Sequence, residues 1–144
     1  MSKLISLYEV SSIKEEYLNK YKILNEKIIN GRKWFRTLPI SELVSGEKKK
    51  FEIGKEEILL INQKGIYATK NICPHMDLPL DMGQITESDT ILCPYHNSEF
   101  YFKSGVVKKW IGSEPESTKE KCDPLEIIPT LEMDSYIWVQ SSSN

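Results

Sequence analysis

Two short segments of the chain each combine one cysteine with one histidine. The first reads Cys73-Pro74-His75 and the second reads Cys93-Pro94-Tyr95-His96, with residues 76–92 between them. A thiolate is a soft, charged donor that suits iron or zinc, and a neutral imidazole is a donor that both metals accept. Each segment therefore offers one sulfur and one nitrogen ligand. The two segments together predict a metal centre.

A proline follows each cysteine, at Pro74 and Pro94. Proline fixes φ and lacks a backbone N–H, so each segment should follow a stiff path. Stiff loops keep the movement of metal ligands small, which lowers the reorganisation cost of any change in the charge of a bound metal. Between the segments, Gly83 and Ser88-Asp89 predict the start and the tip of a short hairpin. Such a hairpin would return the second segment beside the first.

Runs with an apolar period of two predict short β-strands on both sides of these loops. The expected strands are 34–38, 50–53, 58–63, 66–70, 84–86, 90–92, 99–102, 106–110, 125–131 and 136–139. Turn signals separate the first of them, at Ser45-Gly46, Gly54 and Lys64-Gly65. Short strands at this spacing are typical of a small antiparallel sandwich or barrel. We expect an all-β domain over residues 31–144, in which the two metal-binding loops form a subdomain.

Residues 1–30 have a different pattern, which predicts an N-terminal helical extension. Ser12-Ile13-Lys14-Glu15 is a capping box, which satisfies the first amides of a helix. Asn30-Gly31 supplies a stop signal. Apolar residues recur at helical spacing between these signals, at Ile13, Tyr17, Tyr21, Leu24 and Ile28. The apolar face of a helix over 13–29 either packs on the domain or docks a partner, unless the segment is partly disordered.

The composition is that of an ordinary globular protein. The 144 residues are 40% apolar and 28% charged, and a chain of this length can bury a core without disulfides. The net charge of −2 gives no electrostatic reason to expect nucleic-acid binding. No segment reaches the roughly 18 apolar residues of a membrane span, and the first residues do not resemble a signal peptide. We expect a cytoplasmic monomer without a membrane span.

Three cysteines are too few for a secreted disulfide scaffold. The third, Cys122, lies in a Lys121-Cys122-Asp123-Pro124 segment outside the two loops. We interpret Cys122 as a stray thiol at or near the surface. A redox or glutathione-linked role is the alternative.

The pair of loops resembles the Rieske iron–sulfur family, in which a Cys-x-His loop is followed at a distance by a Cys-x-x-His loop. The resemblance covers about residues 32–140 and includes the flanking strands and turns. The flanking residues that carry it are Leu43, Gly46, Gly54, 58–61, 65–68 and 100–107. It implies a domain with one [2Fe–2S] cluster at the tip formed by the two loops.

By this resemblance, Cys73 and Cys93 hold one iron, while His75 and His96 hold the other. Two neutral imidazoles in place of two thiolates raise the reduction potential above that of an all-cysteine cluster. The residues that we expect to surround the ligands and support them are Pro74, Pro94, Tyr95 and Ser98.

Departures from the family pattern bear on the reduction potential. Members of the high-potential, membrane-complex class carry an additional cysteine in each loop, and Leu78 and Tyr95 hold these positions here. Ser98 falls where that class has a serine donor to sulfur, but Phe100 replaces the tyrosine donor and has no hydroxyl. Hydrogen bonds to sulfur favour the reduced cluster. One retained donor of two predicts a low-to-intermediate potential.

The histidine count limits the chemistry of the chain. Ring-hydroxylating oxygenases also carry a Rieske domain, and they add a mononuclear iron held by two histidines and a carboxylate. This chain has only two histidines, and by the resemblance the cluster uses both. Nor does the chain contain a glycine-rich nucleotide fingerprint. We therefore expect a carrier without a catalytic site, which takes single electrons from a donor reductase and supplies an electron-accepting oxygenase or reductase.

Two alternatives remain open at this point. The chain could be a cluster-bearing subunit or redox-sensing module of a larger complex, docked through its N-terminal helix. A structural zinc-binding domain is the other alternative, since two cysteines and two histidines also satisfy tetrahedral zinc. In the carrier hypothesis, an apolar collar meets the partner and nearby carboxylates steer it. The alternative is that the same apolar side chains only shield the cluster from water. The expected collar is Met76, Leu78, Pro79, Leu80 and Tyr95, and the carboxylates are Asp77, Asp81, Glu87 and Asp89.

Overall fold

The computed structural model describes residues 25–74, 77–95, 97–109 and 123–140. Within these ranges the strands are β1 (Glu26–Ile29), β2 (Arg32–Pro39), β3 (Lys48–Ile53), β4 (Glu56–Asn62), β5 (Ile66–Lys70), β6 (Thr90–Leu92), β7 (Glu99–Tyr101), β8 (Val107–Lys109), β9 (Ile127–Ile128), β10 (Thr130–Met133) and β11 (Tyr136–Gln140). A single 3-10 turn, Ile40–Glu42, is the helical element described among them. Nothing helical in this part of the chain is long and apolar enough to cross a bilayer.

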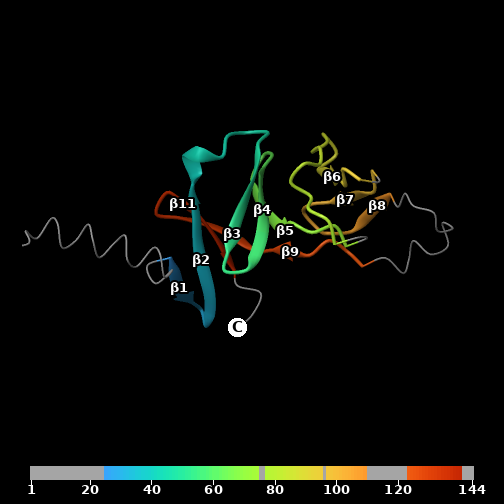
Figure 1. Cartoon of the computed structure of the whole chain (residues 1–144). Coiled ribbons are helices and arrows are strands. Elements are labelled where there is room, and N and C mark those ends of the chain that lie inside the picture. Colours follow the sequence, from blue (N-terminus) through green and yellow to red (C-terminus); the bar gives the residue numbers. More distant parts are fainter. Residues whose placement is uncertain (1–24, 75–76, 96, 110–122, 141–144) are drawn as a thin grey trace, which may run out of the picture.

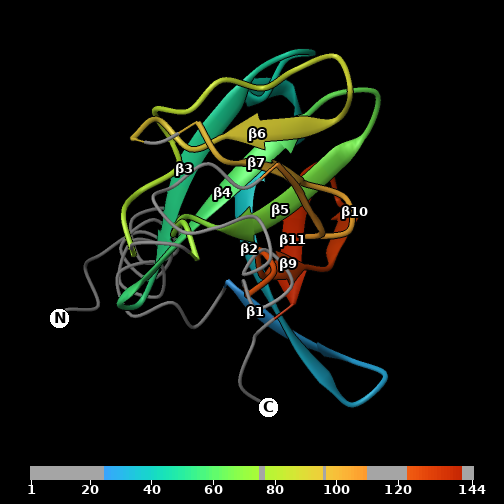
Figure 2. The same cartoon turned by 90° about the vertical axis from the view of Figure 1, so that its right-hand side faces the viewer.

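The strands form three antiparallel sheets, which confirms the expected all-β architecture. We name them the outer sheet (β1-β2-β11-β10), the central sheet (β3-β4-β5-β9) and the loop sheet (β6-β7-β8). Figure 1 shows the central sheet between the other two, with β1 and β8 toward opposite ends of the fold. Figure 2 shows the β1–β2 hairpin projecting from the body of the domain.

Strand β4 is buried on both faces, which explains its unbroken apolar run. Ile58 and Leu60 belong to a core shared with the outer sheet. Leu59 and Ile61 point the other way, because strand side chains alternate, into a core shared with the loop sheet. All four side chains are at most 2% exposed. One strand therefore joins the structural core to the core that carries the two cysteines.

The chain crosses from the central to the outer sheet at Pro129. The sequence predicts one strand over 125–131, but the structure has two: β9 pairs with β5, and β10 pairs with β11. Pro129 lies between them and has no N–H to donate to a ladder. Its carbonyl accepts a hydrogen bond from Gln140 N–H at 3.0 Å. This switch ties the two sheets together.

The prediction of a helix is wrong for the last residues of the expected N-terminal helix. Glu26–Ile29 form β1, which pairs antiparallel with Arg32–Phe35 of β2. Asn30 and Gly31 both have positive φ, at 52° and 78°, as a two-residue type I′ hairpin turn requires. The Asn-Gly pair is thus a hairpin turn and not a helix stop. The earlier part of the expected helix, residues 13–24, lies outside the described residues.

The hairpin between the two loops is present. Ile85 bridges Ile91, and Leu92 N–H donates to the carbonyl of Gln84 at 2.9 Å. The expected strand over 84–86 is reduced to this bridge. Asp89, at φ 63°, lies at the turn as expected.

Gly83 makes a close approach between the segments that carry the two loops. A Cβ at this position would lie 2.0 Å from the carbonyl oxygen of Leu92, the residue before Cys93. The loop segments can therefore pack this closely only because residue 83 has no side chain.

The loop sheet contains a buried polar link between its first two strands. Thr90, which is fully buried, donates its hydroxyl to Glu99 Oε2 at 2.5 Å. Lys108 Nζ on β8 lies 3.4 Å from the same oxygen. The hydrogen bond from Thr90, aided by Lys108, lowers the pKa of Glu99 below its ordinary value. The carboxylate thus connects β6, β7 and β8.

The close approach at Gly83 predicts a large effect for Gly83→Ala. Because the new methyl group would force backbone apart, we expect a loss of about 2 kcal/mol or more in the free energy of unfolding. Chemical denaturation followed by circular dichroism measures this loss. The control is Gly46→Ala, at a glycine with φ 85° and no atom within 4 Å of the added Cβ, which should cost about 1 kcal/mol from backbone strain alone. Equal losses in the two variants would contradict the prediction.

The lowered pKa of Glu99 predicts a specific acid dependence. A carboxyl whose pKa is depressed by folding stabilises the native state above its ordinary pKa of 4.5, and this contribution is lost as the pH falls through the folded-state pKa. Glu99→Gln should therefore destabilise the protein at neutral pH, and its difference from the wild type should shrink as the pH falls below 4.5. Urea unfolding at several pH values measures the difference. Glu132→Gln, which removes an exposed carboxylate on β10, is the control, and an equal pH-dependent difference in that variant would contradict the prediction.

Candidate metal centre

The loop that contains Cys73 is closed by its own backbone. The N–H of Cys73 donates to the carbonyl of Leu78 at 2.7 Å, and the N–H of Asp77 donates to the carbonyl of Cys73 at 2.8 Å. Asp77 has a φ of 55°, a left-handed conformation that aspartate and asparagine tolerate better than most residues. The chain thus turns back on itself directly after the cysteine.

The loop that contains Cys93 repeats this arrangement. The N–H of Cys93 donates to the carbonyl of Ser98 at 2.8 Å, and the N–H of Asn97 donates to the carbonyl of Cys93 at 2.8 Å. Asn97 has a φ of 60°. The two cysteines therefore occupy equivalent positions in two turns with the same hydrogen bonds.

The equivalence extends along both loops, residue by residue. Pro74 matches Pro94, and Tyr95 takes in the second loop the place that His75 has in the first. His75 and His96 lie outside the described residues, so their roles as ligands stay predictions. In the sequence, His75 follows Cys73 by two residues and His96 follows Cys93 by three.

The two thiols share one apolar environment. Cys73 and Cys93 are both fully buried and belong to a single core cluster that also contains Leu80 and Phe100. Within the described residues they form no disulfide. Two buried sulfur donors presented by matched turns fit an iron–sulfur cluster, whose irons prefer thiolate ligands. The donor set in this part of the chain is therefore compatible with that group.

The residues around the two cysteines differ in how much of their surface is exposed to solvent. Ser98 is fully buried beside the second loop, and Phe100 is fully buried in the same core as the thiols. Tyr95 is 50% exposed, so it faces solvent at the tip of the second loop. Leu80, expected in the exposed collar, is instead fully buried. Leu80 therefore does not contact a partner, and its packing in the core that contains both thiols fits the alternative, in which it shields the site from water.

Asn71 is a site residue that the sequence argument missed. It is 1% exposed and lies between β5 and Cys73. Its side-chain oxygen accepts from the N–H of Leu80 at 3.0 Å, and its Nδ2 donates to Asp81 at 2.9 Å and to Glu57 at 3.2 Å. The available signal was an asparagine directly after a buried strand, two positions before Cys73. Buried amides need partners.

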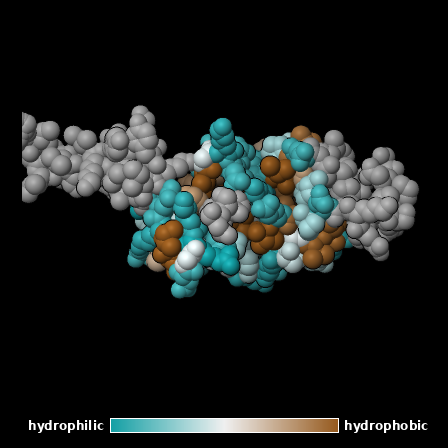
Figure 3. All heavy atoms as spheres, turned by 90° about the horizontal axis from the view of Figure 1, so that it is seen from below, coloured by the Kyte–Doolittle hydropathy of each residue, from teal (hydrophilic) through white to brown (hydrophobic). Residues whose placement is uncertain are grey.

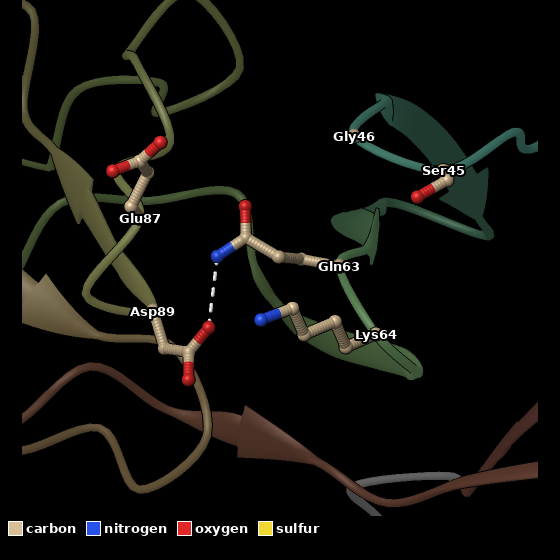
Figure 4. Close-up of a pocket in the computed structure, with 6 residues that line it drawn as sticks. All are labelled: Ser45, Gly46, Gln63, Lys64, Glu87 and Asp89. Atoms are coloured by element: carbon tan, nitrogen blue, oxygen red, sulfur yellow. Dashed lines mark hydrogen bonds between the residues drawn. The ribbon is translucent and has the colours of Figure 1, made fainter.

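Gln63 is a second missed residue, and it holds the hairpin that joins the loops. Its Nε2 donates to Asp89 Oδ1 at 2.8 Å and to the carbonyl of Thr86 at 2.9 Å. Figure 4 shows Gln63 reaching Asp89 at the edge of an open polar cavity. The hydrogen bond from Gln63, followed by that from Lys103, lowers the pKa of Asp89. The central sheet is thus connected by side chains to the tip of the hairpin.

Comparisons with known proteins place the sequence among iron–sulfur proteins. The family model of the Rieske [2Fe-2S] domain matches residues 33–129. The chain is 33% identical over 67 residues to the ferredoxin component of the alkene monooxygenase system of Xanthobacter autotrophicus, covering 46% of this chain and 55% of the relative. It is 37% identical over 68 residues to the ferredoxin component of biphenyl 2,3-dioxygenase of Rhodococcus jostii, covering 46% and 63%. The match spans less than two thirds of each relative.

Solved structures support the same fold. The ferredoxin of carbazole 1,9a-dioxygenase from Nocardioides aromaticivorans superimposes with a TM-score of 0.62 at 21% identity, over 74% of this chain and 95% of that one. A reduced complex between oxygenase and ferredoxin of carbazole 1,9a-dioxygenase contains a chain that matches with a TM-score of 0.65 at 23% identity, over 74% and 27%. At this identity the likeness concerns the fold alone. Together with the family match over residues 33–129, the matched loops and the buried thiols lead to one conclusion: the chain belongs to the Rieske [2Fe-2S] domain family, and its cofactor is a [2Fe–2S] cluster.

Proposed function

We propose that this protein is a one-electron carrier whose cluster is held by Cys73, His75, Cys93 and His96. The observation that carries the proposal is the pair of matched turns that present two buried thiols to one core. In the proposed arrangement the cysteines bind one iron and the histidines bind the other. The bound cluster supplies reversible one-electron redox chemistry at a potential raised by its two neutral ligands.

The protein's own residues keep the site rigid and dry. Each cysteine is fixed by two backbone hydrogen bonds within its turn and is followed by a proline that restricts the chain. Leu80 and Phe100 pack in the same core as the thiols and separate them from water. Ligands held in this way move little when the charge of the site changes. This is the property that an electron carrier needs.

The surface next to the loops fits a brief contact with a partner protein. Ile72, which precedes Cys73, is 42% exposed, and Tyr95 is 50% exposed. On the face displayed in Figure 3, apolar residues form separate patches among polar ones. Small patches of this kind suit weak redox complexes, which bury little area.

The names of the relatives suggest the class of partner. Several are ferredoxin components of oxygenase systems, and ferredoxins of similar fold have been solved in complex with an oxygenase. We propose that this chain receives electrons from a reductase and delivers them to the terminal oxygenase of such a system. It does so as a monomer and without a catalytic site of its own.

The ligand assignment predicts a distinctive spectrum. The protein purified without oxygen and reduced with dithionite should give the electron paramagnetic resonance signal of low average g that histidine-ligated clusters show. Cys73→Ser and Cys93→Ser should lose the visible absorption of the cluster, since both would remove a thiolate ligand. Cys122→Ser is the matched control and should keep it. A colourless protein that contains zinc and no labile sulfide would refute the assignment.

The docking proposal predicts that substitutions beside the two loops slow electron transfer, whereas a substitution far from the loops does not. Ile72→Ala and Tyr95→Ala should each lower the rate of electron transfer to a terminal oxygenase by roughly fivefold, because each removes about 1 kcal/mol of contact energy. Stopped-flow absorption of the reduced protein mixed with oxygenase measures the rate. Ile28→Ala is the control, since Ile28 is 67% exposed but lies on β1, away from the loop sheet (Figure 1). Similar slowing in all three variants would exclude the loops as the docking surface.

A further inference from the structure

Asn71 makes one polar junction from three separate segments of the chain. Its side-chain oxygen accepts from the N–H of Leu80, at the end of the first loop. Its amide nitrogen donates to Asp81, the residue after Leu80, and to Glu57 at the start of β4. Its backbone N–H donates to the carbonyl of Glu57 at 3.0 Å. The junction therefore links the end of β5, the residues that follow the first loop and the start of β4.

A second strand of the central sheet, β3, also forms a hydrogen bond to Asp81. The ammonium of Lys48, on β3, donates to the backbone carbonyl of Asp81. Asp81 is thus held through its side chain by Asn71 and through its main chain by Lys48. The exit of the first loop is fixed to β3 and β4 by contacts that do not involve the cysteine turn itself.

The chemistry of this position requires an amide. An asparagine carries an acceptor and two N–H donors on one short side chain, and the site uses one acceptor contact and two donor contacts. Aspartate could accept from Leu80 but would place a third carboxylate against Glu57 and Asp81. Alanine would leave the buried N–H of Leu80 without this acceptor, which is costly.

We propose that Asn71 is the positioning residue that sets the spacing between the two halves of the metal centre, an inference that rests on the proposed ligand set. The second loop is closed by Ser98 and supported by the loop sheet. The first loop meets that sheet through the backbone contact of Gly83 with Leu92. Asn71 fixes the segment that leads from the first loop to Gly83, so it determines where Cys73 lies relative to Cys93.

The test compares cluster retention in four variants of the full chain. Asn71→Ala and Asn71→Asp should release iron to a chelator, in the absence of oxygen, about tenfold or more faster than the wild type, since residues that orient metal ligands typically contribute 10- to 100-fold to affinity. The double variant Asn71→Asp with Asp81→Asn reverses the polarity of one hydrogen bond and leaves the net charge unchanged. It should recover part of the retention that Asn71→Asp loses.

Asn62→Ala is the matched control. Asn62 donates its amide to the carbonyl of Leu43 at 2.7 Å, so its removal also deletes a partly buried side-chain hydrogen bond, but at the opposite end of β4 from Glu57. The midpoint potential is the second readout: it should shift in Asn71→Ala and stay unchanged in Asn62→Ala, even where both variants lose similar thermal stability. Iron release and potential measured on the isolated protein involve no electron-transfer partner.

The outcomes separate the two proposals. If Asn71→Ala and Asn62→Ala release iron at equal rates and have equal potentials, or if the double variant recovers nothing, the positioning role is wrong. If Asn71→Ala fails to fold, Asn71→Asp and the double variant decide the question. A wild-type protein that retains its cluster but passes no electrons to a terminal oxygenase would refute the carrier function, and the iron-release comparison would still test the role of Asn71.

Discussion

The metal centre depends on bringing two buried thiols into one core, although they come from loops twenty positions apart in sequence. Each cysteine is set locally by a turn in which its own N–H and carbonyl are both engaged. These local bonds fix the shape of each loop but not the relation between the loops. The position of one loop relative to the other is set by the hairpin that joins them and by the close backbone contact at Gly83. Side chains from the central sheet that contact the hairpin and the first loop also contribute.

Strand β4 carries this constraint into the rest of the domain. Because Leu59 and Ile61 face the thiols while Ile58 and Leu60 face the outer sheet, the two cores share one backbone. A shift of that strand would disturb both packed interfaces together, and packed interiors resist such shifts. The polar contacts of Gln63 and Asn71 begin at or beside the ends of β4 and β5. The segments that carry the two cysteines are therefore attached to strands whose central side chains are almost fully buried.

The sequence was most informative where local chemistry decides the structure. The bounds of β5 and β6 were predicted correctly, because turn residues delimit both strands. The helix was wrong over β1 because Asn30-Gly31 can end a helix or form a hairpin, and only pairing with β2 selects the hairpin. Asn71 and Gln63 were missed because their partners are 9 to 26 positions away, and such contacts exist only after the sheets have packed.

The placement of β1 has a consequence for how such a domain can be used by larger assemblies. The β1–β2 hairpin projects from the outer sheet, whereas the cysteine turns lie with the loop sheet beyond the central one (Figures 1 and 2). An attachment made through the hairpin and an encounter made at the loops would use different surfaces and would not compete. The domain is therefore suited to tethering, on a scaffold protein or on an electrode, with the loops that carry the two cysteines left accessible.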